Sequence, residues 1–150
     1  MKHKRYLEQY EHRGYFIFNP KEDLRIKCDA PKDKGGVYLI YKVKELRETL
    51  LYIGSSGQRD KEGNLKIRIG GLYDRLVNGH HSKFGKSTES TSIRKNAFPR
   101  EMLKQGIENI IVYWWVTHDE NKTDFPSDVE KILAEKYVSE HGKLPEWHKQ

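Results

Sequence analysis

GGVYLIYKVKELRETLLYIGSSG, residues 35–57, holds two runs rich in β-branched and aromatic residues on either side of a charged connector. Alternation and composition of this kind predict two β-strands joined as a hairpin. Each run carries a tyrosine close to a glycine, Tyr38 in the first and Tyr52 in the second. Cross-strand tyrosines are common in sheets, so their role depends on which other side chains the chain brings beside them.

The rest of the chain predicts two helices, a strand and a final helix. The apolar spacing of GLYDRLVNG indicates a helix that ends at Asn78-Gly79, and FPREMLKQGI indicates a short helix with Pro99 near its start. NIIVYWWVTH is the most apolar run, which favours a buried central strand, and FPSDVEKILAEKYVSEHG is an amphipathic helix that closes at Gly142. The order strand, strand, helix, helix, strand, helix predicts an α/β (α+β) fold with a small three-stranded sheet covered by helices.

The length and net charge of the chain limit the classes of protein to which it can belong. Its 150 residues fit one domain, and 28 Lys and Arg against 22 Asp and Glu give a net charge of +6 and a pI near 9.3. A basic surface favours polyanions, of which nucleic acid is the commonest. A net charge of this size is also common in small domains, where it keeps the protein soluble. The charge therefore supports nucleic-acid binding only modestly.

Cysteine content and hydropathy exclude several classes. Cys28 is the only cysteine, so an internal disulfide and a cysteine zinc cage are both excluded. The N-terminus has no apolar signal-peptide core, and no stretch approaches the length needed to span a bilayer. We therefore expect a cytoplasmic protein in which residues 1–34 form a lead-in or extension.

GHHSKFGKS, residues 79–87, resembles a phosphate-binding P-loop but does not match it. Five residues separate Gly79 from the Gly-Lys-Ser, where the motif needs four, and the segment follows a helix rather than a strand. What remains is a basic segment, which is either solvated surface or a set of contacts to backbone phosphates. Its adjacent histidines, His80 and His81, lack a supporting ligand for a metal, although either can carry protons near neutral pH.

Glu130 has two interpretations that the residues alone leave open. Ser127 followed three residues later by Glu130 is a capping box, which would give the carboxylate a purely structural role. Glu130 also lies on the shoulder of the apolar stripe of its helix, where a carboxylate can hold a divalent cation. Glu135, four residues from Lys131, is instead typical of an exposed ion pair.

Taken together, the chain resembles the GIY-YIG nuclease domain family over about residues 35 to 148. The resemblance is carried by Gly36-Val37-Tyr38, by Tyr52-Ile53-Gly54, by an arginine in the following helix and by a glutamate on a later helix. It implies a domain over residues 35–150 with a three-stranded antiparallel sheet flanked by helices. The implied activity is that of a metal-dependent endonuclease that hydrolyses DNA phosphodiester bonds.

The chain departs from the family pattern at three places. Both LKIR and LYDR repeat the leucine-x-x-arginine of the family, and we favour Arg75 over Arg68 because Gly70-Gly71 would interrupt a helix that ran on from Arg68. A His or Tyr often lies one turn after the arginine in the family, where this chain has Gly79, with His80 next to it. The late asparagine of the family has no equivalent, and the tail offers His148 instead.

The resemblance assigns a role to each of these residues. Glu130 would bind Mg2+ or Mn2+, which acts on the phosphate as a Lewis acid, and Arg75 would clamp a phosphate oxygen with its planar fork. Tyr38 would be the general base with Tyr52 as its hydrogen-bonding neighbour, and His80 is the rival base. A tyrosine base depends on nearby cations that favour the phenolate form.

The basic loops are expected to bind the substrate, which we take to be double-stranded DNA. The candidates for phosphate contacts are Lys61, Arg68, Lys83, Lys86, Arg94 and Lys95. A second hypothesis is a nucleic-acid-binding module that keeps the nuclease fold without turnover. A third is an unrelated small α/β domain, for which DNA binding would be weak and insensitive to salt.

Overall fold

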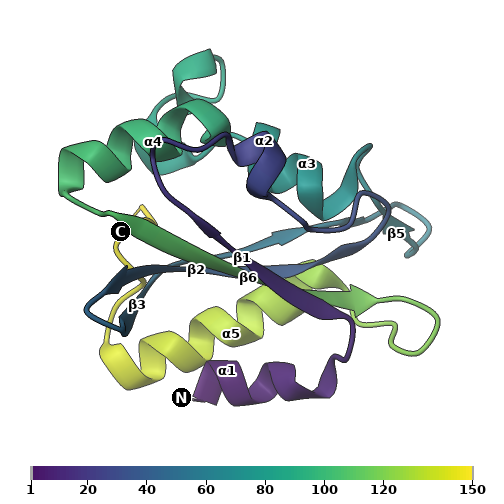
Figure 1. Cartoon of the computed structure of the whole chain (residues 1–150). Coiled ribbons are helices and arrows are strands. Elements are labelled where there is room, and N and C mark those ends of the chain that lie inside the picture. The colour runs from purple at the N-terminus through teal and green to yellow at the C-terminus, as the bar shows by residue number, and fades with distance from the viewer. Residues whose placement is uncertain (1, 150) are drawn as a thin grey trace.

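The computed structural model describes residues 2–149 and belongs to the mixed α+β class that the sequence predicts (Figure 1). Its centre is an antiparallel sheet with the strand order β1-β6-β2-β3. A separate ribbon of two short strands, β4 and β5, follows β3. The bounds of the strands are β1 Arg13–Phe18, β2 Gly35–Lys44, β3 Arg47–Ser56, β4 Gln58–Arg59, β5 Leu65–Lys66 and β6 Asn109–His118.

The main sheet therefore has four strands, and the prediction of three was wrong. The additional strand, β1, lies in the segment that we expected to be a lead-in, and it pairs along β6. Gly14 of β1 makes this pairing possible, because a Cβ at that position would lie 2.4 Å from the ring of Trp114. Phe16 and Phe18 then point into the core, so residues 13–18 belong to the sheet.

Helices cover both faces of the main sheet (Figure 1). One face carries α2, α3 and α4, and the opposite face carries α1 and α5. The bounds of the helices are α1 Lys2–Tyr6, α2 Leu24–Lys27, α3 Gly71–Asn78, α4 Arg94–Gln105 and α5 Pro126–His141, with short 3-10 turns at Leu7–Gln9, Ser82–Phe84 and Ser90–Ser92. The predicted helices at 71–79 and within residues 125–142 are confirmed.

Helix α4 begins earlier than its sequence suggests. We expected Pro99 near its start and a loop before it, but the helix begins at Arg94 and Pro99 lies inside it. The N–H of Ala97 already bonds to the carbonyl of Ile93 at 2.8 Å, so the helix is established before the proline is reached. Arg94 is consequently a helical residue and not a loop residue.

Side chains along β2 point alternately to the two faces of the sheet, so they contribute to two separate hydrophobic clusters. Tyr38 and Ile40 face α3 and α4, whereas Val37, Leu39 and Tyr41 face α1 and α5. The neighbouring strand β6 is buried as predicted, and both of its tryptophans are core residues.

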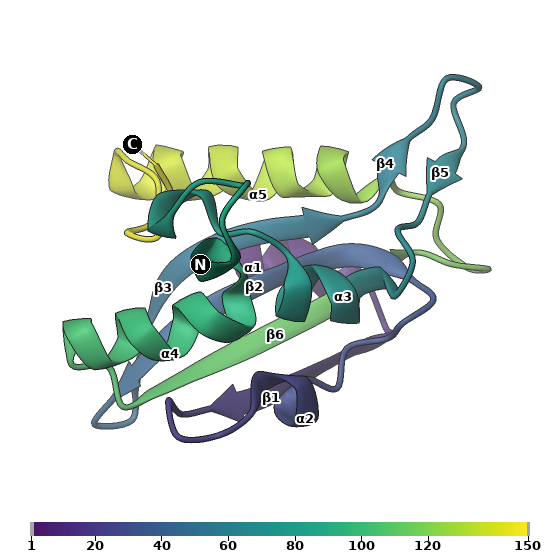
Figure 2. The ribbon, with the colours of Figure 1, turned by 90° about the horizontal axis from the view of Figure 1, so that it is seen from above.

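Strand β3 is one of the two edge strands of the main sheet, and the site lies beside this edge. Helix α5 runs alongside β3, as the view from above shows (Figure 2). The β4–β5 ribbon continues from the end of β3 and is fastened to α5 by Arg59, whose guanidinium lies 2.7 Å from a carboxylate oxygen of Asp128. Side chains of α5 can therefore meet side chains from the opposite face of the sheet by passing the β3 edge.

Candidate functional site

The tyrosine pair lies on the face of the sheet that α3 and α4 cover. Tyr38 is opposite Gly54 in the β2–β3 register, and a Cβ at Gly54 would lie 2.4 Å from the phenol oxygen of Tyr38. The glycine therefore makes room for the tyrosine ring. The rings of Tyr38 and Tyr52 are stacked with their centroids 6.2 Å apart, so the two tyrosines that the sequence singled out do come together.

Arg94 lies at the centre of the site, with an exposed fraction of 0 %. Its Nη1 donates to the phenol oxygen of Tyr38 at 2.5 Å and to the carbonyl of Arg75 at 3.0 Å, and its Nε donates to Nδ1 of His81 at 3.2 Å. Nη2 is buried and has no hydrogen-bond partner within residues 2–149. Arg94 was expected in an exposed basic loop, and that placement was wrong, because Arg94 is the first residue on the buried stripe of α4.

His81 is buried behind Arg94 and is neutral. Because Nδ1 accepts from Arg94, the ring proton is on Nε2, which donates to the carbonyl of Trp147 at 2.9 Å. Burial first, and then the charge of Arg94, lower the pKa of His81 to about 3. The residue therefore positions the guanidinium and does not exchange protons near neutral pH.

Tyr52 is held between two histidines. Its ring centroid lies 4.5 Å from that of His81 and 4.2 Å from that of His148. His148 accepts a hydrogen bond from the main-chain N–H of Ile53 at 3.0 Å, and burial lowers its pKa to about 4. Burial also raises the pKa of Tyr52. His148 of the tail is thus packed against the second tyrosine.

Arg75 and Glu130 meet beside these rings. Arg75, on α3, lies within hydrogen-bonding reach of Tyr38, and its electrostatic interaction with Tyr38 is the largest cause that raises the pKa of Arg75. Glu130, on α5, is hydrogen-bonded to Ser55, and burial raises its pKa in spite of that bond and of the two nearby arginines. Glu130 does not close a capping box, because α5 starts at Pro126 with Phe125 as its N-cap and no side-chain cap.

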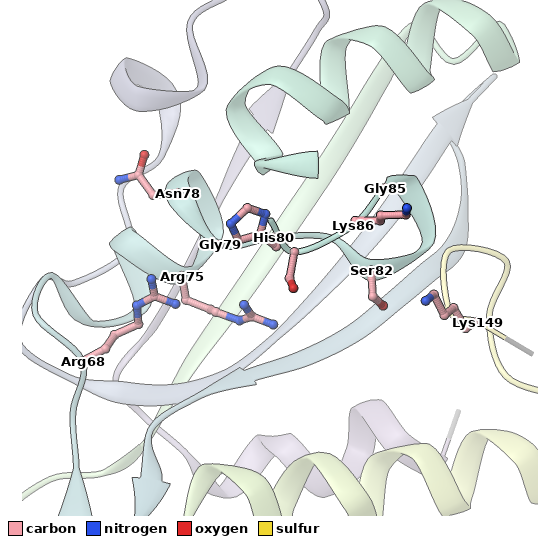
Figure 3. A pocket seen from close by; sticks show the side chains of 10 residues that line it. Arg68, Arg75, Asn78, Gly79, His80, Ser82, Gly85, Lys86 and Lys149 are labelled. Carbon is pink, nitrogen blue, oxygen red and sulfur yellow. The ribbon is translucent and has the colours of Figure 1, made fainter. Parts of the chain in front are cut away.

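Two adjoining cavities open onto these groups. We call the first the glutamate cavity; its volume is about 480 Å³, and its lining includes Tyr52, Ser55, Arg75 and Glu130. The second, the basic cavity, has a volume of about 440 Å³ and is lined by Arg75, His80 and Lys86 among others (Figure 3). Arg68 and Arg75 line both cavities. Tyr38 has an exposed fraction of 0 % and lines neither.

The basic residues expected to contact phosphate are spread over several surfaces. Arg68 and Lys86 line cavities, although Arg68 also forms an ion pair with Asp74 at 2.7 Å. The other exposed or half-buried candidates lie elsewhere: Lys61 on the β4–β5 turn, Lys83 against the carbonyl of Glu146, and Lys95 on α4 in the field of Asp23.

The sequence singled out Arg94 as a phosphate contact and His81 as one of two adjacent histidines, but it did not predict that both are buried. A signal for the burial of Arg94 exists. Phe98 and Met102 are buried on α4, and continuing their four-residue spacing backwards reaches Arg94. His81 has no such signal, because only the tertiary structure decides which of two adjacent histidines turns inward. Ser55, the hydroxyl partner of Glu130, also had no signal in the sequence.

The oxygen groups around Glu130 suit a hard divalent cation. Glu130 and Ser55 line the glutamate cavity, and Mg2+ is commonly held by one or two carboxylates, with water and substrate oxygens as its remaining ligands. Within residues 2–149 there is no cluster of three or more His, Cys, Asp or Glu side chains arranged for a metal. A cation at this site would therefore depend on Glu130 as its main protein ligand.

Comparisons with protein-family models, with curated proteins and with solved structures found no match for this chain. Among residues 2–149, no helix is both long and apolar enough to cross a membrane.

Proposed function

We propose that the protein is a metal-dependent endonuclease that hydrolyses phosphodiester bonds of double-stranded DNA. The observation that carries the proposal is the meeting of two guanidiniums, two phenols and one half-buried carboxylate beside a cavity of about 480 Å³. Such a set offers cations for a phosphate and a carboxylate for a metal ion within one site. The resemblance of the sequence to the GIY-YIG nuclease family supports the same conclusion.

Unbalanced positive charge makes the site suited to an anion. Arg94 is fully buried without a carboxylate at ion-pair distance among the described residues, and its Nη2 lacks a partner. Burying an uncompensated charge is costly, which favours an anionic ligand in the same region. A phosphodiester has both the negative charge and the oxygen acceptors that this arrangement requires.

Each side chain has a role in this proposal. Arg75 lines the cavity and clamps a non-bridging phosphate oxygen, and Glu130 holds Mg2+ or Mn2+, which when bound supplies Lewis-acid stabilisation of the phosphate. Tyr38 is the general base, because its phenol oxygen accepts a hydrogen bond from Arg94 and lies within reach of Arg75. His80 remains the rival base, since it lines the basic cavity while Tyr38 is covered.

The covered position of Tyr38 favours one alternative, a module that binds nucleic acid without cleaving it. In the present arrangement Arg75 is engaged with the phenol, so water must reach Tyr38 after a phosphate draws Arg75 away. If that exchange does not occur, the site binds an anion and catalyses nothing. Cleavage assays separate the two functions.

The test is nicking of a supercoiled plasmid by the full chain with Mg2+, followed by gel electrophoresis. We expect nicking that stops with a chelator and with Glu130→Gln, whereas Glu135→Gln, an exposed carboxylate on the same helix, leaves it unchanged. Binding of the plasmid without nicking under Mg2+ and Mn2+ would replace the endonuclease by the binding module. Salt-insensitive, weak binding would overturn both functions.

A further inference from the structure

The segment that fails as a P-loop nevertheless surrounds a cavity. Of the ten residues that line the basic cavity, six belong to residues 79–87: Gly79, His80, Ser82, Gly85, Lys86 and Ser87. The segment leaves the C-terminal end of α3, where a helix dipole repels anions. Any anion held there must therefore be bound by side-chain cations and free N–H groups rather than by a helix N-terminus.

The basic cavity carries positive charge that nearby carboxylates balance only in part. Figure 3 shows Arg68 and Arg75 on one side of the cavity and Lys86 and Lys149 on the other. Asp74 neutralises Arg68, but within residues 2–149 no ion pair engages Arg75, Lys86 or Lys149. None of the lining residues is acidic, so the cavity is selective for an anion.

The loop also offers main-chain donors in a fixed arrangement. The N–H groups of Gly85, Lys86 and Ser87 have no intramolecular hydrogen-bond partner in the described part of the chain. Ser92, which is fully buried, bonds to Nδ1 of His80 at 2.5 Å and to the carbonyl of Lys86 at 2.7 Å. This hydroxyl fastens both ends of the loop segment, so its donors are held in place before a ligand arrives.

We propose that the basic cavity binds the backbone phosphate next to the one that is cleaved, on the same strand. The inference rests on the proposed function, because the scissile phosphate occupies the glutamate cavity in that proposal. Arg68 and Arg75 line both cavities, so two successive phosphates can share these two guanidiniums. The basic cavity then sets the register of the strand, while the loop contributes affinity that depends on salt but not on base sequence.

The first experiment measures DNA binding in the Glu130→Gln background, where cleavage does not interfere. We expect Lys86→Ala to weaken binding of a short duplex about tenfold at moderate salt and to reduce the slope of log K against log salt by about 1. Lys104→Ala is the matched control, since Lys104 is an exposed lysine on α4 that does not line the cavity. Equal effects of the two substitutions would overturn the proposal.

The second experiment places a neutral methylphosphonate at each linkage of the duplex in turn. One linkage adjacent to the cleaved position should weaken binding in the Glu130→Gln protein, and that loss should disappear when Lys86→Ala is added. A loss that Lys86→Ala leaves unchanged contradicts the assignment.

A third measurement separates failure of the site from failure of the proposed function. Inorganic phosphate is titrated into the full chain, and amide NMR shifts are followed. Shifts at Gly85, Lys86 and Ser87 that Lys86→Ala removes support the anion site even if plasmid nicking is absent. Nicking without such shifts retains the endonuclease and overturns this inference.

Discussion

Tyr38 and Tyr41 lie three residues apart on β2, are both almost completely buried, and face opposite sides of the sheet. Tyr41 packs among apolar and aromatic side chains, and burial raises its pKa. Its nearest polar partner is Nε2 of His3 at 3.4 Å. Tyr38 instead accepts a hydrogen bond from Arg94 and lies within reach of Arg75. Burial is therefore common to both tyrosines, and each has a cation over its ring, Lys4 at Tyr41 and Arg94 at Tyr38, both 5.2 Å from the ring centroid. What distinguishes the candidate site is the guanidinium that donates directly to the phenol oxygen of Tyr38.

Removing each hydroxyl in turn tests whether only the tyrosine on the charged face is needed for cleavage. We expect Tyr38→Phe to lower plasmid cleavage by about 100-fold or more, the range of a general base, and Tyr41→Phe to change it by less than about threefold. Initial nicking rates at saturating Mg2+ measure both. If Tyr38→Phe cleaves normally and His80→Gln loses the activity, the base is His80 and the phenol only positions the arginines.

A second comparison concerns the two arginines that line both cavities. Arg75 has no ion pair in the described chain and is largely buried, so Arg75→Ala should reduce the cleavage rate about 100-fold with the fold intact. Arg68 is neutralised by Asp74, and Arg68→Ala should mainly weaken binding by several-fold. Single-turnover rates and duplex affinity separate the effects. The reverse pattern would transfer the catalytic role to Arg68.

The tyrosine on the charged face also depends on a glycine opposite it. Gly54→Ala should lower the free energy of unfolding by roughly 1–3 kcal/mol, because the new Cβ would lie 2.4 Å from the ring of Tyr38. Urea unfolding measures this loss. In a double-mutant cycle with Tyr38→Ala, the loss from Gly54→Ala should shrink, since the ring is no longer there. Additive losses would mean that the alanine acts elsewhere.

Local pattern predicted most of the elements, because strands β2, β3 and β6 are rich in β-branched and aromatic residues and helices α3 and α5 both end at a glycine. It did not predict that β1 joins the sheet, since RGYFIF is a short run whose partner, β6, is about a hundred residues away. The resemblance to the nuclease family, rather than local pattern, singled out Tyr38, Tyr52, Arg75 and Glu130, and the structure places all four around one region.

The burial of Arg94 inside the site could not be predicted from the sequence, for a physical reason. Arginine is almost never fully buried unless it is paired, so composition favoured a surface position for Arg94. Its burial depends on partners from three separate segments, namely Tyr38, His81 and the carbonyl of Arg75. Such a convergence becomes visible only when the tertiary structure is known.

Acid stability also distinguishes the buried histidine of the charged face from exposed histidines. The pKa of His81 is about 3 in the folded protein and near 6.5 in an unfolded chain. As the pH falls below about 6.5, the unfolded chain takes up a proton that the folded protein does not, so stability decreases. This loss continues down to about pH 3 and contributes about 1 kcal/mol per pH unit.

His81→Asn should remove that contribution while keeping an acceptor for Nε of Arg94. Urea unfolding between pH 6.5 and pH 4.5 should therefore show a shallower pH dependence in this variant, whatever its absolute stability. His141→Asn, at an exposed position on α5, should leave the slope of the parent protein unchanged. If His81→Asn and the parent have the same slope, His81 is protonated in the fold and cannot accept from Arg94. The guanidinium would then be held toward Tyr38 by its other contacts alone.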